Sequence, residues 1–283
     1  MDSLLGFLVL GCIVFFLLNS GGNSNKKKSR NNPPHGSSRI SSTHKSKPAT
    51  STKGSTIRRE GWVPTYEGPM LSQPGEVGEL FSYASYSGAY SLDAPFALID
   101  LETSGFEAGS AKVLEVAIVK MDSKGKILGT FSTLVNPGDG EVGRTDIHQI
   151  SLSMVKNAPK MSEVIGDLVK FIDSTIVVAH NAKFEERFLN AALRDSGINL
   201  RGIPTIDTLW LSRQVIKLPN YKLATVIDGF GETIENAHTA MGDVLAMTKI
   251  LPSMLKMAKP IKYPSQLVQS PEVKTSGKVL PRA

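Results

Sequence analysis

Two acidic residues, Asp100 and Glu102, stand at the end of a short apolar run that begins at Phe96. Residues two apart on a β-strand project from the same face, so both carboxylates would point in one direction. Crowded carboxylates repel each other and raise each other's pKa, and hard divalent cations with oxygen ligands relieve that repulsion. On its own, the pair would favour a simpler interpretation in which Glu102 is a solvated acid in a loop. Further ligands elsewhere in the chain are needed to predict a metal site.

Three segments carry those further candidates, in order along the chain. They are Asp100-Leu101-Glu102-Thr103-Ser104-Gly105, His180-Asn181-Ala182-Lys183-Phe184-Glu185 and His238-Thr239-Ala240-Met241-Gly242-Asp243. They resemble the three motifs of the DnaQ-like 3′–5′ exonucleases of the DEDDh subclass, a family that includes the exonuclease domain of the DNA polymerase III epsilon subunit. Each motif is weak alone, but the ordered set is specific. Two intervening segments, 146–151 and 204–209, also resemble recurrent parts of the family, and the resemblance covers roughly residues 96–255.

The resemblance implies a ribonuclease-H-like fold and a two-metal mechanism. The two Mg²⁺ or Mn²⁺ ions would be held by four carboxylates, those of Asp100, Glu102, Glu185 and Asp243. His238 would take the proton from the attacking water, a role that suits an imidazole titrating near pH 7. His238 and Asp243 are five residues apart, so on one continuous helix they would point about 140° apart. They converge only if His238 lies in the loop before the helix, and Asn236 just upstream suits such a break.

Glu185 departs from the family pattern, which has Asp at this place. The charge is kept, but the side chain is longer by one methylene, and a site held within about 0.5 Å is sensitive to that change. The neighbouring Glu186 points about 100° away round the helix and is a poorer candidate ligand. Two interpretations therefore stay open. The first is an active exonuclease, and the second is a catalytically weakened exonuclease-fold module that binds nucleic acid or serves as a scaffold at a membrane.

Substrate contacts are implied by the resemblance as well. Thr103 and Ser104 would lie by the terminal nucleotide, Phe106 would be a wedge against its base, and Asn181 would bond near the phosphate. For Phe106 and Phe184, packing in the core explains an aromatic residue at least as well as stacking does. The partners implied are the 3′ ends of single-stranded DNA or RNA. The motifs do not distinguish DNA, RNA and short oligonucleotides, and they identify no replication or repair protein as a partner.

The hydrophobic pattern supplies elements that would hold these residues. Apolar, β-branched runs bounded by turn residues predict strands over 96–102, 113–121, 126–135 and 175–179. Amphipathic stretches predict helices over 162–171, 184–195, 207–216 and 223–230, and from 238 to about 257. A three-stranded meander followed by alternating strands and helices predicts an α/β domain with a mixed sheet flanked by helices.

Composition limits the class of protein. The 283 residues are 41% hydrophobic and carry a net charge of +6, with a single cysteine, which excludes an internal disulfide framework and a zinc site built from several cysteines. The charge is uneven, because residues 20–59 hold ten basic and no acidic residues, whereas residues 94–258 hold 17 basic and 19 acidic ones. The basic excess is therefore no argument that the folded part binds nucleic acid.

The N-terminal residues predict attachment to a membrane. Residues 3–20 are mostly apolar and uncharged, and they lack the positive start and the cleavage site of a signal peptide. We interpret them as a single transmembrane anchor whose basic C-terminal side, and with it the catalytic domain, faces the cytoplasm. The expected organisation is this anchor, a disordered basic linker (21–59), an aromatic-containing lead-in (60–92), the exonuclease domain (93–258) and a basic C-terminal tail (259–283).

Overall fold

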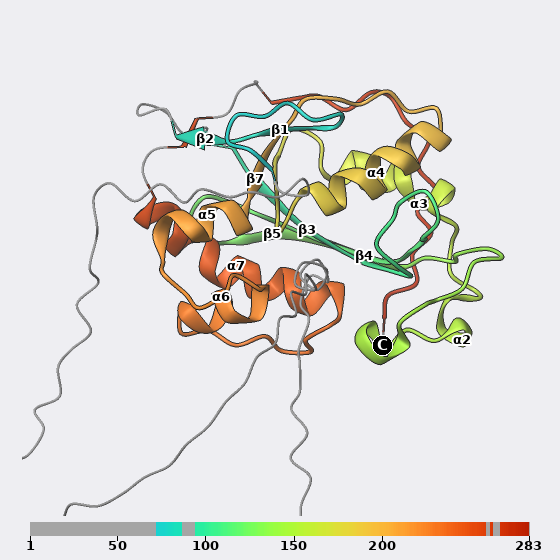
Figure 1. The fold of residues 1–283 in the computed structure, drawn as a ribbon. Helices are drawn as coiled ribbons and strands as arrows, with labels where there is room; N and C mark the ends of the chain where they lie inside the picture. Colours follow the sequence, from blue (N-terminus) through green and yellow to red (C-terminus); the bar gives the residue numbers. More distant parts are fainter. Residues whose placement is uncertain (1–71, 87–93, 259–260, 263–266, 283) are drawn as a thin grey trace, which may run out of the picture. The chain divides into compact units, whose positions relative to one another are not determined.

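The computed structural model describes residues 72–86, 94–258, 261–262 and 267–282 (Figure 1). The predicted anchor, the predicted linker and part of the lead-in lie outside these residues. Within the described ranges, no helix is both long enough and apolar enough to span a bilayer.

A six-stranded mixed sheet organises the described residues, in the order β1-β7-β6-β3-β4-β5. Its strands are β1 (Phe81–Tyr83), β3 (Phe96–Thr103), β4 (Val113–Met121), β5 (Ile127–Leu134), β6 (Ile176–Ala179) and β7 (Ile203–Asp207). Strands β3, β4 and β5 form the predicted antiparallel meander, and β3, β6, β7 and β1 pair in parallel. A separate antiparallel pair joins β2 (Ser85–Tyr86) to β8 (Ile261–Lys262). The mixed α/β sheet predicted from the pattern is confirmed.

Helices cover both faces of this sheet (Figure 1). They are α1 (Thr145–His148), α2 (Leu152–Val155), α3 (Met161–Phe171), α4 (Lys183–Asp195), α5 (Thr208–Val215), α6 (Leu223–Gly229) and α7 (Ala240–Met257). The predicted helices are present, with two informative shifts at their starts. Helix α5 begins after Asp207, whose carboxylate accepts a hydrogen bond from the amide of Leu209 and caps the helix. Helix α7 begins two residues after His238, with Thr239 as its cap.

Alternate residues of β3 face two different cores, and this alternation places the acidic pair. Ala97, Ile99 and Leu101 pack into the core that includes residues of α3 and α4. Phe96 and Leu98 pack into the other core, with residues of α5, α6 and α7. Asp100 and Glu102 continue this second set, because side chains alternate across a strand. Both carboxylates are thus presented toward the face that α7 covers.

Candidate active site

Three carboxylates meet between β3 and the first turn of α7. Asp100, Glu102 and Asp243 are all buried, and each has a carboxylate oxygen within 4.8 Å of one from each of the other two. The two strand residues reach this point because they share a face of β3, and Asp243 reaches it because α7 packs across β3 and β4. We call these three residues the acidic triad.

His238 lies in the turn that precedes α7, as the argument from helical angles required. Its backbone is left-handed, with a φ of 66°, and it lies close enough to Asp243 for its backbone to oppose the rise in the pKa of that carboxyl group. Gly242 makes this close approach possible, because a Cβ there would lie 2.4 Å from the carbonyl oxygen of Asn236. A glycine in the first turn of α7 therefore lets the turn before the helix fold back against it. The result places His238 beside Asp243 although the two are five residues apart in sequence.

Burial dominates the electrostatics of the triad. It raises the pKa of Asp243 to about 7 and holds the pKa values of Asp100 and Glu102 well above their usual range, and the negative charge of Asp243 raises the latter two further. Without a cation, this cluster therefore retains protons near neutral pH. Buried, crowded carboxylate oxygens are the donor set that hard divalent cations take, so the residues present fit Mg²⁺ or Mn²⁺.

Glu185 lies next to the triad but outside the set of oxygens within 4.8 Å. Glu185 is 1% exposed, and its Oε2 atom has no hydrogen-bond partner among the described residues. Burial raises its pKa, and its charge is one of those that raise the pKa of Asp100. The longer side chain thus still brings a carboxylate into the field of Asp100. A buried carboxylate oxygen without a partner is costly, and a cation nearby would offset that cost.

Glu186 has a structural role instead. Its carboxylate accepts hydrogen bonds from the amides of Leu80 and Phe81, both at 2.9 Å, and from the hydroxyl of Tyr83 at 2.6 Å. These contacts anchor β1 to α4. The two adjacent glutamates therefore point in different directions, Glu185 toward Asp100 and Glu186 toward β1, as their angular separation on the helix indicated.

The motif residues after β3 form a structured loop. The hydroxyl of Thr103 donates to the carbonyl oxygen of Gly105 at 2.7 Å, and the hydroxyl of Ser104 accepts from the amide of Lys112 at 2.9 Å. Phe106 follows with 44% of its surface exposed, so it is not a core residue. Its exposed ring is consistent with the expected wedge.

The second motif supplies one polar side-chain atom without a hydrogen bond to the described residues. Asn181 is buried, and its Oδ1 atom has no partner within that part of the chain, while its backbone amide donates to Asp207 at 3.0 Å. Phe184, by contrast, is buried and packs on Phe188 with ring centroids 4.9 Å apart. For Phe184 the core-packing interpretation holds.

Two other histidines near the motifs have both ring nitrogens engaged. His180 contacts the hydroxyl of Thr208 at 3.0 Å and the carbonyl oxygen of Tyr221 at 2.9 Å. His148 contacts the carbonyl oxygen of Val142 at 2.9 Å and accepts from the amide of Ile150 at 3.0 Å. Neither ring has a nitrogen left for proton transfer, so both are structural and His238 is the candidate base.

Glu115 is a site residue that lies outside the three motifs. It lies opposite Glu102 in the β3–β4 pairing and is completely buried. Its Oε2 atom accepts from the amide of Ala240 at 3.3 Å and from Arg282 at 3.1 Å. The available signal was one acid inside the otherwise apolar strand 113–119, but nothing in the local pattern indicated that a residue far along the chain would pair with it.

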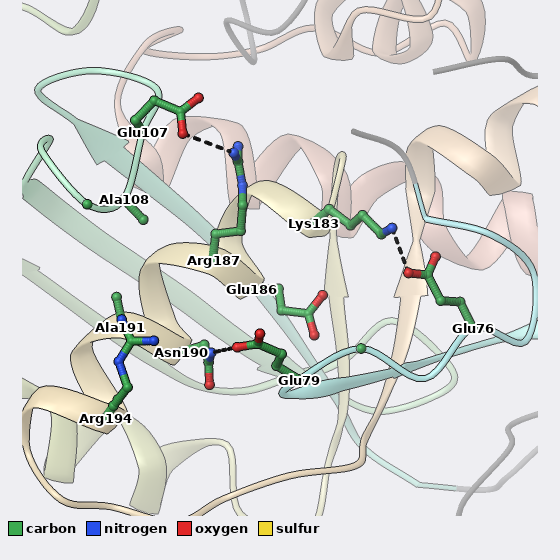
Figure 2. Close-up of a pocket in the computed structure, with 12 residues that line it drawn as sticks. Glu76, Glu79, Glu107, Ala108, Lys183, Glu186, Arg187, Asn190, Ala191 and Arg194 are labelled. Carbon is green, nitrogen blue, oxygen red and sulfur yellow. Dashed lines mark hydrogen bonds and ion pairs between the residues drawn. The ribbon is translucent and has the colours of Figure 1, made fainter. Parts of the chain in front are cut away.

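A hollow of about 440 Å³ lies along α4 (Figure 2). Two of its three cations pair with acids: Lys183 with Glu76 at 2.6 Å, and Arg187 with Glu107 at 3.9 Å, while Arg194 is the third. Glu79 contacts Asn190 in the same hollow. With Glu186 also in its lining, the hollow has more acidic than basic groups, which is the wrong balance for a nucleic-acid phosphate.

A family model described as an exonuclease, RNase_T, matches residues 97–251, which is more than half of the chain. The chain belongs to the RNase_T exonuclease family. The membership inferred from the three motifs is thereby confirmed. Among relatives, the chain is 31% identical over 186 residues to the DNA polymerase III subunit epsilon of Treponema pallidum, which covers 63% of this chain and 85% of that protein. It is 33% identical over 171 residues to the PolC-type DNA polymerase III of Clostridium perfringens, covering 60% of this chain but 12% of the polymerase.

Solved structures of the family share the fold. The nuclease domain of 3′hExo, a DEDDh family member bound to rAMP, matches with a TM-score of 0.54 at 17% identity, covering 63% of this chain and all of that domain. Escherichia coli Exonuclease I in complex with a dT13 oligonucleotide matches with a TM-score of 0.53 at 16% identity, covering 58% of this chain and 41% of that chain. The RNase-H-like exonuclease fold expected from the motifs is therefore present.

Proposed function

We propose that this chain is a metal-dependent 3′–5′ exonuclease that hydrolyses phosphodiester bonds at the 3′ end of single-stranded nucleic acid. The observation that carries the proposal is the buried acidic triad, with His238 in the left-handed turn just before the helix that bears Asp243. Two names among the matches support it: an epsilon subunit of DNA polymerase III and an Exonuclease I that binds an oligonucleotide. The chain corresponds to a small part of the PolC-type relatives, so their wider activities carry no weight here.

Asp100, Glu102 and Asp243 would hold two Mg²⁺ or Mn²⁺ ions, and Glu185, whose charge acts on Asp100, would bind one of them or its water. When bound, the ions would neutralise the carboxylates, polarise the scissile phosphate and lower the pKa of the attacking water. The protein's own contribution is to hold the carboxylates in position. β3 fixes two of them on one face, and the first turn of α7 brings the third.

His238 would accept the proton of the attacking water. Burial lowers its pKa, so the imidazole is neutral near pH 7 and able to take a proton. Hydrolysis then adds water across one P–O bond and gives a nucleoside 5′-monophosphate and a strand shortened by one nucleotide with a new 3′ hydroxyl. Phe106 would stack on the terminal base, and Asn181 would bond near its phosphate.

The test uses a 5′-labelled single strand with Mg²⁺ or Mn²⁺. A 3′–5′ exonuclease produces a ladder of shortened labelled strands, whereas a 5′–3′ enzyme releases the label at once. Asp100→Asn should abolish the ladder, and Asp139→Asn, at an exposed acid that is not part of the triad, should leave it unchanged. DNA, RNA and dinucleotide substrates run in parallel would identify the preferred class.

The opposite outcome is equally clear. If the parent chain binds the labelled strand but cuts none of these substrates with either ion, the exonuclease proposal is wrong. The departure at Glu185 would then favour the second interpretation, a weakened exonuclease-fold module that binds nucleic acid.

We also propose that the chain is held at a membrane with the exonuclease domain on the cytoplasmic side. The support is the apolar run over residues 3–20 and the basic residues that follow it. The full-length chain should remain in the membrane fraction through a high-salt wash and be released by detergent. Recovery in the soluble fraction would contradict the anchor, and release by salt alone would mean that the basic linker, not the apolar run, makes the contact.

A further inference from the structure

Residues 267–282 form neither helix nor strand and run past α3 to the C-terminal end of the described chain (Figure 1). We call this segment the strap. The amides of Ser270 and Ser276 donate to Asp173 at 2.5 Å and to Asp167 at 2.8 Å. Leu280 exchanges hydrogen bonds with β5, donating to the hydroxyl of Thr133 at 2.9 Å and accepting from the amide of Leu134 at 2.8 Å. The strap is therefore tied to the domain along its whole course.

A glycine in α3 lets the strap lie close to that helix. A Cβ at Gly166 would be 2.1 Å from the carbonyl oxygen of Lys274. No L side chain fits in that space without movement of the strap or the helix. The helix thus carries a contact surface that suits the strap, at a distance from the acidic triad.

The strap brings the guanidinium of Arg282 to the edge of the site. The Arg282 side chain is 11% exposed, and its Nη1 atom pairs with Oε2 of Glu115 at 3.1 Å. Nη1 also donates to the carbonyl oxygen of His238 at 3.4 Å, and Nη2 donates to the carbonyl oxygen of His148 at 2.8 Å. One side chain therefore joins β4, the turn before α7 and the end of α1.

These contacts bear on the position of His238. The residue has a left-handed backbone, which a non-glycine residue keeps only where its surroundings hold it. Its carbonyl oxygen is held by Arg282, and the following helix begins with the amide of Ala240 bonded to Glu115. Glu115 in turn is buried across from Glu102, and Arg282 is the cation paired with it. Removing the guanidinium would release the turn and leave Glu115 buried without its counter-charge.

We propose that Arg282 is a positioning residue of this active site, whose guanidinium clamps Glu115 and the His238 turn so that His238 stays beside the acidic triad. The catalytic part of the test rests on the exonuclease function proposed above. Arg282 does not touch the reacting atoms in this arrangement. It acts through His238 and through Glu115.

The variants are made in the full-length chain: Arg282→Gln, Arg282→Lys, and Lys278→Ala as the matched control. Lys278 is another cation of the strap, but it pairs with Glu163 on α3 at 2.5 Å and is largely exposed. Arg282→Gln should lower kcat by about 10–100-fold, the usual cost of losing a partner that orients a metal-site residue, with KM changed less than kcat. Arg282→Lys should restore part of kcat, because it keeps the charge but not the forked geometry. Lys278→Ala should match the parent.

A second measurement does not depend on catalysis. Amide hydrogen exchange over residues 236–242 should be faster in Arg282→Gln than in the parent and in Lys278→Ala, with the core strands unchanged. Gly166→Ala gives a route that leaves Arg282 in place: displacement of the strap should speed exchange in the same turn and lower kcat. If the parent chain cleaves no substrate, the proposed function fails while the exchange experiment still tests the clamp.

Three results would overturn the proposal. The first is unchanged exchange in the His238 turn when Arg282 is Gln. The second is a kcat equal to that of the parent with the turn loosened. The third is a variant faster than the parent, which would mean that the strap shields the site and that Arg282 restrains the enzyme. An Arg282→Gln chain that does not fold would leave the decision to Arg282→Lys and Gly166→Ala, for which unchanged exchange and kcat would likewise contradict the clamp.

Discussion

The buried carboxylate of Asp243 would bind the ions, but its ionisation lowers the stability of the metal-free protein. The side chain is buried, and its pKa rises from 3.8 to about 7. The folded protein then binds this proton more tightly than the unfolded chain does, so stability is lost as the pH rises between those two values. At 1.36 kcal/mol for each pH unit, the loss is about 4 kcal/mol above neutral pH. Asp243→Asn removes the ionisation while keeping the size of the side chain.

The expected result is a variant that is more stable and inactive. With a chelator at about pH 8, Asp243→Asn should unfold at a temperature about 10 °C above that of the parent, because 1 kcal/mol shifts the midpoint of a domain of this size by about 2–4 °C. The difference should shrink toward zero as the pH falls to about 4, where both proteins carry a neutral side chain. Adding Mg²⁺ or Mn²⁺ at the higher pH should stabilise the parent more than the variant.

Thermal unfolding followed by circular dichroism, across this pH range and with and without the ions, makes the measurement. Asp139→Asn is the control, because it removes a carboxylate at an exposed position. A stability difference between Asp243→Asn and the parent that is the same at both ends of the range would refute the assignment to the ionisation of Asp243. A variant less stable than the parent at the higher pH without ions would refute the claim that the buried, ionised carboxylate of Asp243 costs stability when no cation is bound.

Three further outcomes are expected. Gly242→Ala should lower kcat at least about tenfold, because the new Cβ would lie 2.4 Å from the carbonyl oxygen of Asn236 and push the His238 turn away. Steady-state kinetics measure this effect, and an unchanged kcat would contradict it. Glu186→Gln should cost about 1–3 kcal/mol of stability, because one carboxylate oxygen of Glu186 accepts hydrogen bonds from two backbone amides and the other accepts one from the Tyr83 hydroxyl. The kcat of the folded variant should stay near that of the parent. Denaturant unfolding and kinetics together distinguish this structural role from a catalytic one. Burial lowers the pKa of His238 below its ordinary 6.5, so kcat/KM should stay high through neutral pH and fall only on the acid side of that value. His238→Asn should lower the plateau and remove the part of the fall that this residue causes.

The local elements were predictable because their signals are local. The strands that carry and flank Asp100 and Glu102 are apolar runs bounded by turn residues, and the meander follows from two short connections. The loop position of His238 followed from helical angles together with the convergence on Asp243 that the resemblance implies, whereas the hydrophobic pattern alone started the helix at residue 238 and α7 begins at Ala240. Strands β1 and β7 escaped prediction. β7 contains Pro204 and is five residues long, and β1 is three residues long and pairs with β7 across more than a hundred residues of chain.

Some residues of the candidate site could likewise be predicted from local sequence signals, and others could not. Asp100, Glu102, Asp243 and His238 could be identified because they lie within short segments whose residue types and spacing match one chemistry. Glu115 could not, because an acid within a strand is no signal until the strand facing it is known. The role of Gly242 required coordinates, since a close approach between a turn and a helix has no counterpart in the pattern of residues. The departure at Glu185 was visible in the sequence, but its buried, unpartnered oxygen was not.

By itself, the sequence determined the family, the ordered set of acids with their histidine, and the strands and helices that bear them, because periodicity and motif spacing depend on residues close together in the chain. The tertiary structure decided which carboxylates share one buried volume, and therefore which pKa values rise. It also decided that Arg282 pairs with Glu115, 167 residues away in sequence. The physical reason is that burial and charge pairing depend on distance in space. For residues so far apart, only the packing of the folded chain sets that distance.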